Sequence, residues 1–396
     1  MAERTNGSLV VVGAGLMGSG IAQVAAAAGH RVILADAQAG ATARARDSMA
    51  SALGKLVEKG KLAADARTAL LGRIDFIDAP LGGAPAMYSD CGVVIEAIVE
   101  DREVKRTLFA ALSGVIAPDA ILATNTSSLS VASLASAATN PDRVIGVHFF
   151  NPAPVMPLVE IVPALSTDAA VTAAARALVD AWGKTTVLAT DTPGFIVNRV
   201  ARPFYGESLR ILEEGIADCA TIDWAMRTIG GFRMGPFELM DFIGNDVNYA
   251  VTSSVFEGMF YDPRYRPALT QRRLVESGRL GRKTKLGYYD YRDGAEMPKP
   301  GEDRELGGRI VDRVLVMLIN EAVDALNLRI ATAHDLDLAM TKGVNYPKGL
   351  LAWCDELGAP VVLELLDSLY EEYGEDRYRA SPLLRRAAMA GATLSG

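Results

Sequence analysis

The chain has 396 residues, which suggests roughly two or three domains rather than one. Half of the residues are hydrophobic and 22% are charged, a balance that excludes long disordered segments. The net charge of −8 excludes a general polyanion binder, so nucleic acid is not expected as a partner. The three cysteines lie more than 100 residues apart, which predicts neither a disulfide framework nor a zinc site and suits a reducing, cytoplasmic setting.

No targeting or membrane-spanning segment is expected. The first eight residues are mostly polar and lead directly into an apolar run, without the charged and apolar regions of a signal peptide. The longest stretch without a charged residue, residues 120–141, is rich in Ser, Thr and Asn. A membrane helix needs about 20 mainly apolar residues, so no membrane partner is predicted.

The first half of the chain alternates between short β-branched runs and Ala-rich stretches. The helical stretches include residues 17–28 and 104–116. Such alternation predicts a parallel sheet with helices on both faces. The pattern ends near residues 186–188. The expected strands are residues 9–12, 31–35, 93–95, 121–123, 144–147 and 158–162.

The second half changes to long amphipathic helices and repeats itself. Residues 196–213 carry apolar side chains at helical spacing, and little after them resembles a strand. Residues 196–200 match residues 310–314, and residues 222–226 match residues 336–340, at one constant offset of 114 positions. This register predicts two copies of a helical domain. The alternative is a pair of unrelated amphipathic helices that look alike.

The expected fold class is therefore α/β, with a Rossmann-type doubly wound parallel sheet followed by two repeated all-helical domains. The domains are expected at residues 1–189, 190–292 and 306–396. Residues 292–305, between the two helical copies, are rich in Gly, Pro and charge, as a linker would be.

A glycine-rich turn follows the first expected strand. Residues 13–18 form the pattern G-x-G-x-x-G between a strand and a helix, which is typical of dinucleotide binding because the helix N-terminus faces the phosphates. Asp36 ends the next strand, 18 residues after Gly18, where a carboxylate accepts a hydrogen bond from the ribose 2′-hydroxyl of NAD and repels the phosphate of NADP. His30 and Arg31 lie nearby and weaken this preference slightly. The alternative is a packing turn with a capping Asp. The predicted NAD-binding residues are Gly13, Ala14, Gly15, Leu16, Met17, Gly18 and Asp36.

Oxidation of an alcohol needs a base for the hydroxyl proton, and His148 is the best-placed candidate. His30 lies in a Gly-His-Arg turn, where we expect an exposed residue, and His334 lies at a predicted helix start, where we expect a cap. His148 ends its expected strand, at the sheet edge where ligands bind. Glu160 lies inside an apolar strand and needs a partner. We predict a His148–Glu160 dyad whose carboxylate orients the ring; the alternative is a structural histidine.

Several stretches resemble the L-3-hydroxyacyl-CoA dehydrogenase family. The most specific are His-Phe-Phe-Asn-Pro-x-Pro from His148 and Thr-Pro-Gly-Phe-Ile-Val-Asn-Arg from Thr192. The resemblance covers residue 9 to about residue 291. The second helical copy resembles bacterial members with tandem domains, which include 3-hydroxybutyryl-CoA and 3-hydroxyadipyl-CoA dehydrogenases. The other matching stretches are residues 13–18, 94–100, 125–129, 160 and 281–284.

The resemblance implies roles for individual residues. His148 would be the base and Glu160 its partner, while Asn198 would stand near His148 and the thioester. Ser127 would bond the substrate oxygen; its alternative role is to cap the helix that follows Ser130. Ser127 and Lys59 would contact the CoA substrate, although Lys59 also suits a solvated helix face. No metal is expected. The nicotinamide end of the cofactor would meet Glu100, Lys105, Ser127, Asn151 and Lys283.

Two positions depart from the family pattern. Ala52 stands where the family usually has Ser, beside Ser51, and affects one CoA contact. Lys285 replaces the middle glycine of Lys-Thr-Gly-x-Gly, which affects the backbone at Lys283.

The sequence thus predicts a cytoplasmic NAD-dependent enzyme that reversibly oxidises an L-3-hydroxyacyl-CoA to a 3-ketoacyl-CoA, in fatty-acid or aromatic-acid metabolism of the β-oxidation type. One alternative is a dehydrogenase of the same family that acts on a small hydroxy acid without CoA. Another is a non-catalytic, NAD-binding structural protein. In the second copy Asp312 replaces Asn198, so this copy is expected to be a packing partner, in a monomer or a homodimer.

Overall fold

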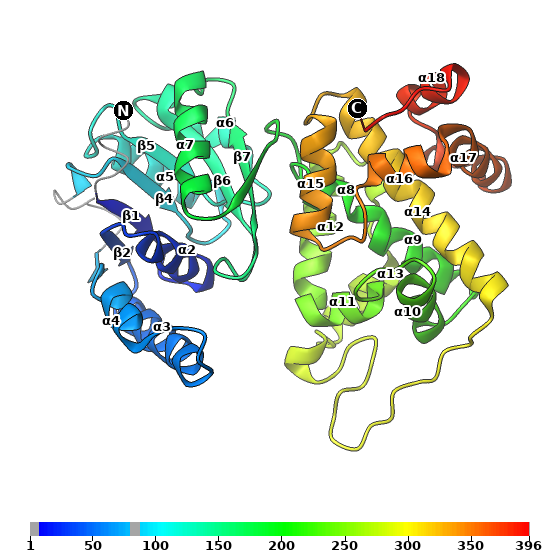
Figure 1. Cartoon of the computed structure of the whole chain (residues 1–396), viewed down its shortest axis with the longest axis horizontal. Coiled ribbons are helices and arrows are strands. Elements are labelled where there is room, and N and C mark those ends of the chain that lie inside the picture. Colours follow the sequence, from blue (N-terminus) through cyan, green and yellow to red (C-terminus); the bar gives the residue numbers. More distant parts are fainter. Residues whose placement is uncertain (1–7, 80–87, 396) are drawn as a thin grey trace. The chain divides into compact units, whose positions relative to one another are not determined.

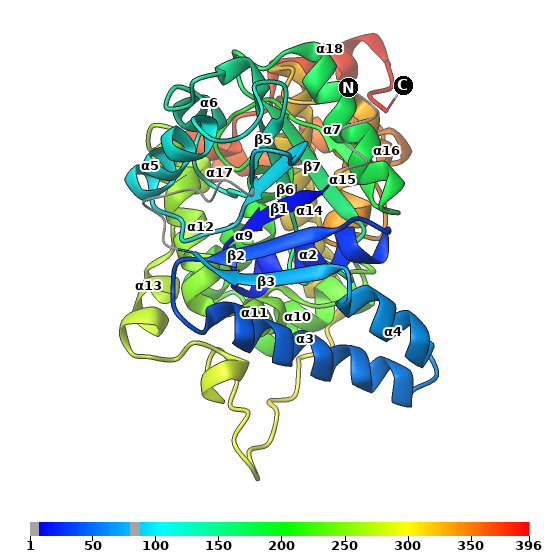
Figure 2. The same ribbon diagram turned by 90° about the vertical axis from the view of Figure 1, so that its left-hand side faces the viewer.

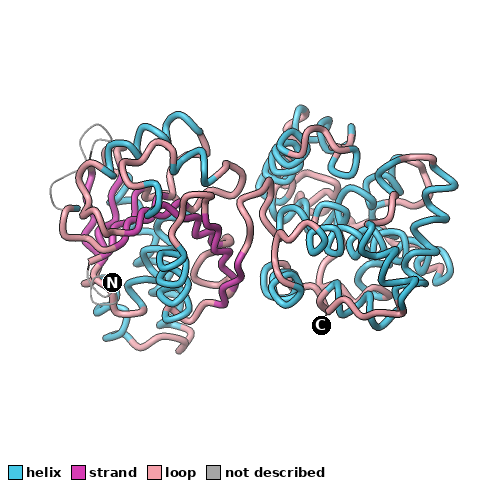
Figure 3. The backbone as a smooth tube through the Cα atoms, turned by 90° about the horizontal axis from the view of Figure 1, so that it is seen from above, coloured by secondary structure: helices cyan, strands magenta, loops and turns pink. Residues whose placement is uncertain are grey.

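The structure, a computed structural model, describes residues 8–79 and 88–395. The backbone divides into two units, Met1–Thr192 and Pro193–Gly396 (Figure 1). Figure 3 shows the sheet within the first unit, whereas the second unit consists of helices and loops. Among the described residues, no helix is long and apolar enough to cross a membrane.

The first unit is built on an eight-stranded sheet with the strand order β3-β2-β1-β4-β5-β6-β7-β8. Strands β1 to β6 run parallel, β7 runs antiparallel to β6, and β8 pairs parallel with β7. Figure 2 shows β2 and β3 at one side of this sheet. The strands are β1 (Leu9–Val12), β2 (Val32–Asp36), β3 (Ile74–Asp78), β4 (Val93–Glu96), β5 (Ile121–Thr124), β6 (Val144–Phe149), β7 (Leu158–Pro163) and β8 (Thr185–Leu188).

Helices cover both faces of this sheet, as the alternating sequence predicts. Leu9 and Val11 belong to one hydrophobic core, while Val10 between them is also completely buried. Because successive strand side chains point to opposite faces, both faces are covered. The helices of this unit are α2 (Leu16–Ala27), α3 (Ala41–Glu58), α4 (Ala64–Leu71), α5 (Arg102–Ser113), α6 (Val131–Ala135) and α7 (Ala169–Ala181), with a 3₁₀ turn η2 (Pro141–Arg143).

The expected strands all form, within two residues of their expected bounds, but the expected list contains neither β8, where the alternating pattern ends, nor β3. The sequence of β3 carries two aspartates among three apolar residues, and it pairs only with β2 at the edge of the sheet. An edge strand needs less apolar surface than a central one, so its sequence signal is weak.

The second unit contains two successive sets of helices. The first helical set, residues 193–291, contains α8 (Val197–Val200), α9 (Arg202–Glu213), α10 (Cys219–Thr228), α11 (Pro236–Ile243), α12 (Asn245–Gly258), η3 (Pro263–Tyr265), α13 (Leu269–Glu276) and η4 (Arg282–Thr284). The second helical set, residues 304–395, contains α14 (Arg304–Asn327), α15 (Ala333–Gly343), α16 (Leu350–Leu357), α17 (Ala359–Tyr373), η5 (Asp376–Tyr378) and α18 (Pro382–Ala390).

These two sets repeat one order of elements. Helices α10, α11 and α12 each begin 114 positions before α15, α16 and α17. Residues 292–303 between the sets contain no helix or strand. The single helix expected at residues 196–213 is instead two helices, α8 and α9, because Pro203 lacks a backbone N–H and its ring crowds the preceding turn.

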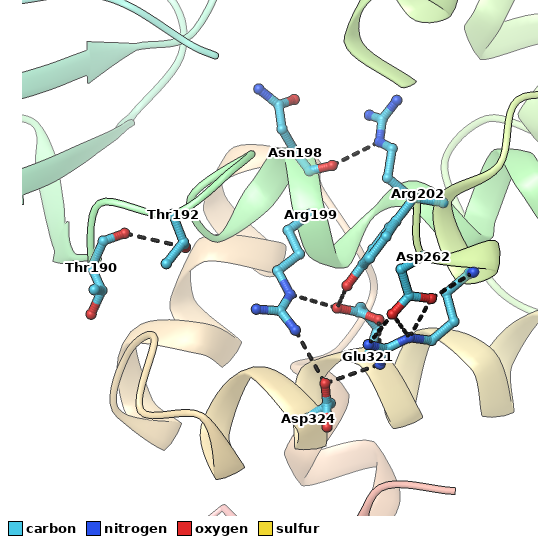
Figure 4. Close-up of polar contacts among 10 residues, drawn as sticks. Thr190, Thr192, Asn198, Arg199, Arg202, Asp262, Glu321 and Asp324 are labelled. Carbon is cyan, nitrogen blue, oxygen red and sulfur yellow. Dashed lines mark hydrogen bonds and ion pairs between the residues drawn. The ribbon is translucent and has the colours of Figure 1, made fainter. Parts of the chain in front are cut away.

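Buried ion pairs join the two helical sets. Arg199 Nε donates to Glu321 Oε1 at 2.6 Å, and its Nη2 donates to Asp324 at 3.2 Å (Figure 4). Arg313 Nε donates in turn to Glu207 Oε2 at 3.0 Å. Arg199 and Arg313 are 114 positions apart, and so are Glu207 and Glu321. Each set therefore supplies an arginine to the glutamate of the other set.

Candidate active site

The glycine-rich turn between β1 and α2 has the geometry of a phosphate-binding loop. Gly13 has a φ of 107°, and a Cβ at this position would lie 2.4 Å from the carbonyl oxygen of Ala97. A Cβ on Gly18 would lie 1.8 Å from the carbonyl oxygen of Gly13. Glycine is therefore required at both positions. By contrast, no atom lies within 4 Å of a Cβ built on Gly15.

Gly15 also caps α2 without any side-chain hydrogen bond to the first turn. Backbone N–H groups at a helix N-terminus attract phosphate when no side chain takes them. The open space at Gly15 and this first turn fit the pyrophosphate of a dinucleotide, as the sequence predicts. Leu16, the first residue of α2, is 71% exposed.

Asp36 lies at the end of β2 and faces the same turn. Its Oδ2 accepts a hydrogen bond from the backbone N–H of Ala14 at 2.7 Å, and its Oδ1 accepts one from Gln38 at 2.8 Å. Asp36 lines a cavity of about 520 Å³ together with Gly15. The carboxylate thus stands at the cavity wall, beside the turn, in a position suited to a ribose hydroxyl.

The same cavity extends along α3. Ala52, which replaces the usual serine of the family, lies in its wall, as do Arg44 and Ser48. Lys59 is the exposed C-cap residue of α3 and is not part of the wall. A contact of Lys59 with CoA stays a prediction.

His148 and Glu160 lie side by side in the sheet. They are direct partners in the antiparallel pair of β6 and β7. His148 Nδ1 lies 2.7 Å from Glu160 Oε2, and both side chains are buried. An ionised carboxylate only accepts hydrogen bonds, so it selects the tautomer with the proton on Nδ1 and the basic lone pair on Nε2. The expected contact between the two side chains is present, while their role as a catalytic dyad stays a prediction. The ring of Phe150 packs against the imidazole with centroids 4.6 Å apart.

Ser127 follows β5 at the same sheet edge. Its backbone N–H donates to Glu100 Oε1 at 3.0 Å, and no hydrogen bond of its hydroxyl is found among the described residues. The alternative role of Ser127 as a helix cap is wrong, because Ser130 caps α6 by accepting from the N–H of Ser133. The Ser127 hydroxyl is therefore available to a ligand.

Glu100 and Lys105 form an ion pair rather than two separate groups. Lys105 Nζ lies 3.0 Å from Glu100 Oε2 and 2.8 Å from Glu96 Oε1, and the lysine is buried. Burial would raise the pKa of Glu100, but Lys105 and the hydrogen bonds from Thr126 and Ser127 lower it below its ordinary value. Glu100 remains an anion that holds the loop containing Ser127.

The sequence interpretation gave no role to Glu96, which organises this part of the site. Glu96 ends β4 and is completely buried. Its Oε1 accepts from the N–H of Ile98 at 2.7 Å, and its Oε2 accepts from the hydroxyl of Thr124 at 2.7 Å. A glutamate in an apolar strand is the same signal that identified Glu160.

Asn125 is a second residue without a predicted individual role. It follows β5, and its side-chain oxygen accepts a hydrogen bond from the backbone N–H of Phe149 at 2.9 Å. This bond joins the end of β5 to the residue that follows His148. Asn151, which follows Phe150, is exposed, and its contact with the cofactor stays a prediction.

The other two histidines differ from expectation. His30 is half-buried rather than exposed, and its ring packs on Trp182 with centroids 5.7 Å apart. His334 is exposed and does not cap its helix, because Thr332 caps α15 by accepting from the N–H of Asp335. Within residues 8–79 and 88–395, neither histidine has a buried carboxylate partner like that of His148.

Two of the predicted site residues belong to the second unit. Asn198 lies in α8, and its backbone carbonyl accepts from Arg202 Nε at 2.7 Å. Lys283 in η4 donates to Asp246 at 2.6 Å. The residue that replaces the family glycine, Lys285, has a φ of 55°, which is a left-handed conformation. The backbone therefore keeps the glycine-like turn without the glycine.

The sequence is similar to proteins of one dehydrogenase family. Residues 8–192 match the family described as 3-hydroxyacyl-CoA dehydrogenase, NAD binding domain. Residues 194–291 and residues 308–394 each match the family described as 3-hydroxyacyl-CoA dehydrogenase, C-terminal domain. The chain is 39% identical to the 3-hydroxyadipyl-CoA dehydrogenase of Escherichia coli K12, over 96% of this chain and 97% of that protein.

Two further matches cover different shares of the chain. A 3-hydroxybutyryl-CoA dehydrogenase of Bradyrhizobium diazoefficiens is 42% identical, over 73% of this chain and 96% of its own length. A crystal structure of 3-hydroxybutyryl-CoA dehydrogenase from Escherichia coli K12 matches the whole chain, with a TM-score of 0.90 and 38% identity. This match covers 97% of this chain and 98% of that chain.

Proposed function

The chain belongs to the 3-hydroxyacyl-CoA dehydrogenase family, and we propose that His148 and Glu160 perform the proton transfer of its NAD-dependent reaction. The reaction converts an L-3-hydroxyacyl-CoA to a 3-ketoacyl-CoA and is reversible. The observation that carries this proposal is the buried contact of 2.7 Å between His148 Nδ1 and Glu160 Oε2. A buried carboxylate of this kind stabilises the imidazolium that forms when the ring takes a proton.

The proton and the hydride leave the substrate separately. His148 Nε2 takes the proton from the 3-hydroxyl group, and Glu160 offsets the positive charge on the ring. The Ser127 hydroxyl holds the substrate oxygen, and Asn198 contacts the thioester. When bound, NAD accepts the hydride from C3 of the substrate. In the reverse direction the imidazolium returns the proton to the carbonyl oxygen.

Cofactor binding is assigned mainly to residues of the first unit. The turn from Gly13 to Gly18 binds the pyrophosphate, and Asp36 accepts a hydrogen bond from the ribose hydroxyl. Glu100 and Lys105 act as a pair that fixes the loop of Ser127, since Lys105 is buried between two carboxylates. Asn151 and Lys283 remain candidates for the nicotinamide end, and Lys59 for the CoA phosphate.

The two helical sets are proposed to be copies of one domain, residues 190–292 and 306–396, of which only the first contributes to catalysis. The protein is then a monomer, or a homodimer formed through another surface. A cytoplasmic setting suits its cysteines, none of which is in a disulfide.

The test is the variant His148→Gln, with NADH formation measured for 3-hydroxybutyryl-CoA. We expect kcat to fall by about 10²–10⁴, the usual contribution of a general base, while NAD still binds in a fluorescence titration. The control is His334→Gln, which removes an exposed histidine and should leave kcat unchanged. Near-normal turnover of His148→Gln would exclude this residue as the base.

The same assay separates the alternative functions. Oxidation of free 3-hydroxy acids with no benefit from CoA would favour a dehydrogenase of small hydroxy acids. NAD binding without oxidation of any hydroxy compound would favour a structural protein. We expect neither result, because a binding protein has no need of the buried His148–Glu160 pair.

A further inference from the structure

Arg202, the first residue of α9, is a buried arginine without an acidic partner. Its side chain is 7% exposed. Nε donates to the backbone carbonyl of Asn198 at 2.7 Å, and Nη1 donates to the hydroxyl of Thr252 at 3.1 Å. Its guanidinium carbon lies 4.9 Å from the ring centre of Tyr205. Among the described residues, no carboxylate forms an ion pair with it.

This isolation sets Arg202 apart from the other buried arginines of the second unit. Arg199, Arg313 and Arg377 each bind a buried glutamate. Burial lowers the pKa of Arg202, which only nearby tyrosines partly offset, yet an arginine stays charged at neutral pH. A buried charge without a partner is costly, so an anion from outside the chain would stabilise it.

A second polar group nearby also lacks a partner. The hydroxyl of Tyr346 is buried and makes no hydrogen bond among the described residues. The ring of Tyr346 packs on that of Phe204, two residues after Arg202, with centroids 5.7 Å apart. Burial and the nearby Tyr205 raise the pKa of Tyr346, and the charge of Arg202 lowers it in part. Arginine and a tyrosine hydroxyl are both donors, a combination that suits a carboxylate.

Arg202 is also adjacent to Asn198, which we propose contacts the thioester. Figure 4 shows the side chains of Asn198 and Arg202 pointing to the same side of the chain, away from the network of Arg199 and Glu321. Arg202 Nε donates to the backbone carbonyl of Asn198 at 2.7 Å, so the guanidinium lies beside the residue proposed to meet the thioester. In a six-carbon diacid, five bonds of about 1.5 Å separate the two carboxyl carbons, or roughly 6 Å in the extended chain.

We propose that Arg202 binds the distal carboxylate of a dicarboxylic 3-hydroxyacyl-CoA, whose thioester meets Asn198. Arg202 is then a specificity-determining residue, and the preferred substrate has an acyl chain that ends in a carboxylate rather than a methyl group. This inference rests on the proposed function. The second helical set has Val316 at the position of Arg202 and Leu366 at that of Thr252, so this arginine is not one of the reciprocal ion-pair residues that the two sets share.

The experiment compares two substrates with six acyl carbons, 3-hydroxyadipyl-CoA and 3-hydroxyhexanoyl-CoA, which differ only at the distal end. For the wild-type enzyme we expect kcat/KM to be higher for the dicarboxylic substrate. In Arg202→Gln the ratio of the two kcat/KM values should fall by about 10- to 100-fold, the usual value of a hydrogen bond to a charged group, mainly through KM. Arg202→Lys keeps the charge and should keep part of the preference.

The controls separate the possible failures. Arg273→Gln removes one positive charge from an exposed position of α13 and should not change the ratio. If wild-type enzyme oxidises neither substrate, the proposed function fails. If it oxidises both but prefers 3-hydroxyhexanoyl-CoA, Arg202 does not bind the distal carboxylate. The same conclusion follows if Arg202→Gln lowers kcat/KM equally for both substrates. The second result would instead indicate a phosphate of CoA or NAD as its anion. If Arg202→Gln does not fold, two measurements still test the proposal. They are the substrate preference of the wild-type enzyme and the ratio of the two kcat/KM values in Arg202→Lys.

Discussion

The two helical sets of the second unit share their packing residues and differ in their polar site residues. Arg199 and Glu207 of the first set correspond to Arg313 and Glu321 of the second, and each arginine binds the glutamate of the opposite set. By contrast, Asn198 corresponds to Asp312. The second set therefore keeps the ion-pair residues that hold the two sets together. The residue proposed to contact the substrate, Asn198, is present only in the first set.

An aspartate that caps a neighbouring helix is also present in both sets. Asp223 accepts hydrogen bonds from the first N–H groups of α11, and Asp337 does the same for α16. In both sets the preceding glycine, Gly235 or Gly349, leaves room that a Cβ would fill. These contacts lie within each set, whereas the ion pairs of Arg199 and Arg313 cross between the sets and resemble the isologous interface of a symmetric dimer.

The largest effect is expected from removing the second set altogether. Truncation after Asp293 would expose the face of the first set against which α14 packs, and would remove Tyr346 and Trp353 from the ring of Phe232. We expect aggregation or new self-association, because a large apolar surface is left uncovered. Analytical ultracentrifugation against the full chain measures this. A truncated chain that stays monomeric, soluble and fully active would contradict the comparison.

The next effect comes from the reciprocal ion pairs. Glu321→Gln and Glu207→Gln each remove one carboxylate charge from a buried ion-pair network in which Arg199 keeps Asp324 and Arg313 keeps Glu214. Each should therefore lower the free energy of unfolding by about 1.5–3 kcal/mol, the usual value of a hydrogen bond to a charged group. The control is Glu305→Gln, whose partner Arg309 lies on the surface and whose effect should be small. Urea denaturation gives the values. If only one of the two substitutions lowers the free energy of unfolding, the two sets do not contribute equally to the packing between them.

The third prediction exchanges the corresponding residues Asn198 and Asp312 between the two sets, and we expect its effect to be smaller than that of the ion-pair variants. Asn198→Asp gives the first set the residue of the second, and we expect kcat/KM to fall by roughly 10², the usual cost of losing an oriented donor. Asp312→Asn makes the opposite change and should leave kcat/KM unaltered. Burial raises the pKa of Asp312, so removing its charge should not destabilise the protein at neutral pH. Equal losses of activity in both variants would show that the second set also takes part in the reaction.

The smallest effect is expected at Lys285, a position that has no counterpart in the second set. A left-handed conformation costs a non-glycine residue about 1–2 kcal/mol, whereas glycine loses more chain entropy on folding. Lys285→Gly should therefore raise the free energy of unfolding by about 0.5 kcal/mol, with kcat/KM unchanged. A loss of stability in urea denaturation would show that the lysine side chain contributes more than its backbone costs.

Much of the fold follows from local patterns in the sequence. The β-branched runs, the glycine turn and the Ala-rich helices identify six strands and the dinucleotide-binding half, because their periodicity and their glycines act within a few residues. His148 and Glu160 are 12 positions apart, joined by one short loop, so their contact was also predictable. The two edge strands β3 and β8 were not among the six. In β3, two aspartates obscure the pattern.

Tertiary structure alone decided the partners of the charged residues. The sequence offers Lys105 and Glu100 as two separate cofactor contacts, whereas the turn from β4 into α5 brings Lys105 between Glu96 and Glu100. Arg199 meets Glu321 across 122 positions. Arg202, three residues later, meets no acid among the described residues. No local pattern distinguishes these two arginines, because the free energy of a buried charge depends on which distant side chains the fold brings to it.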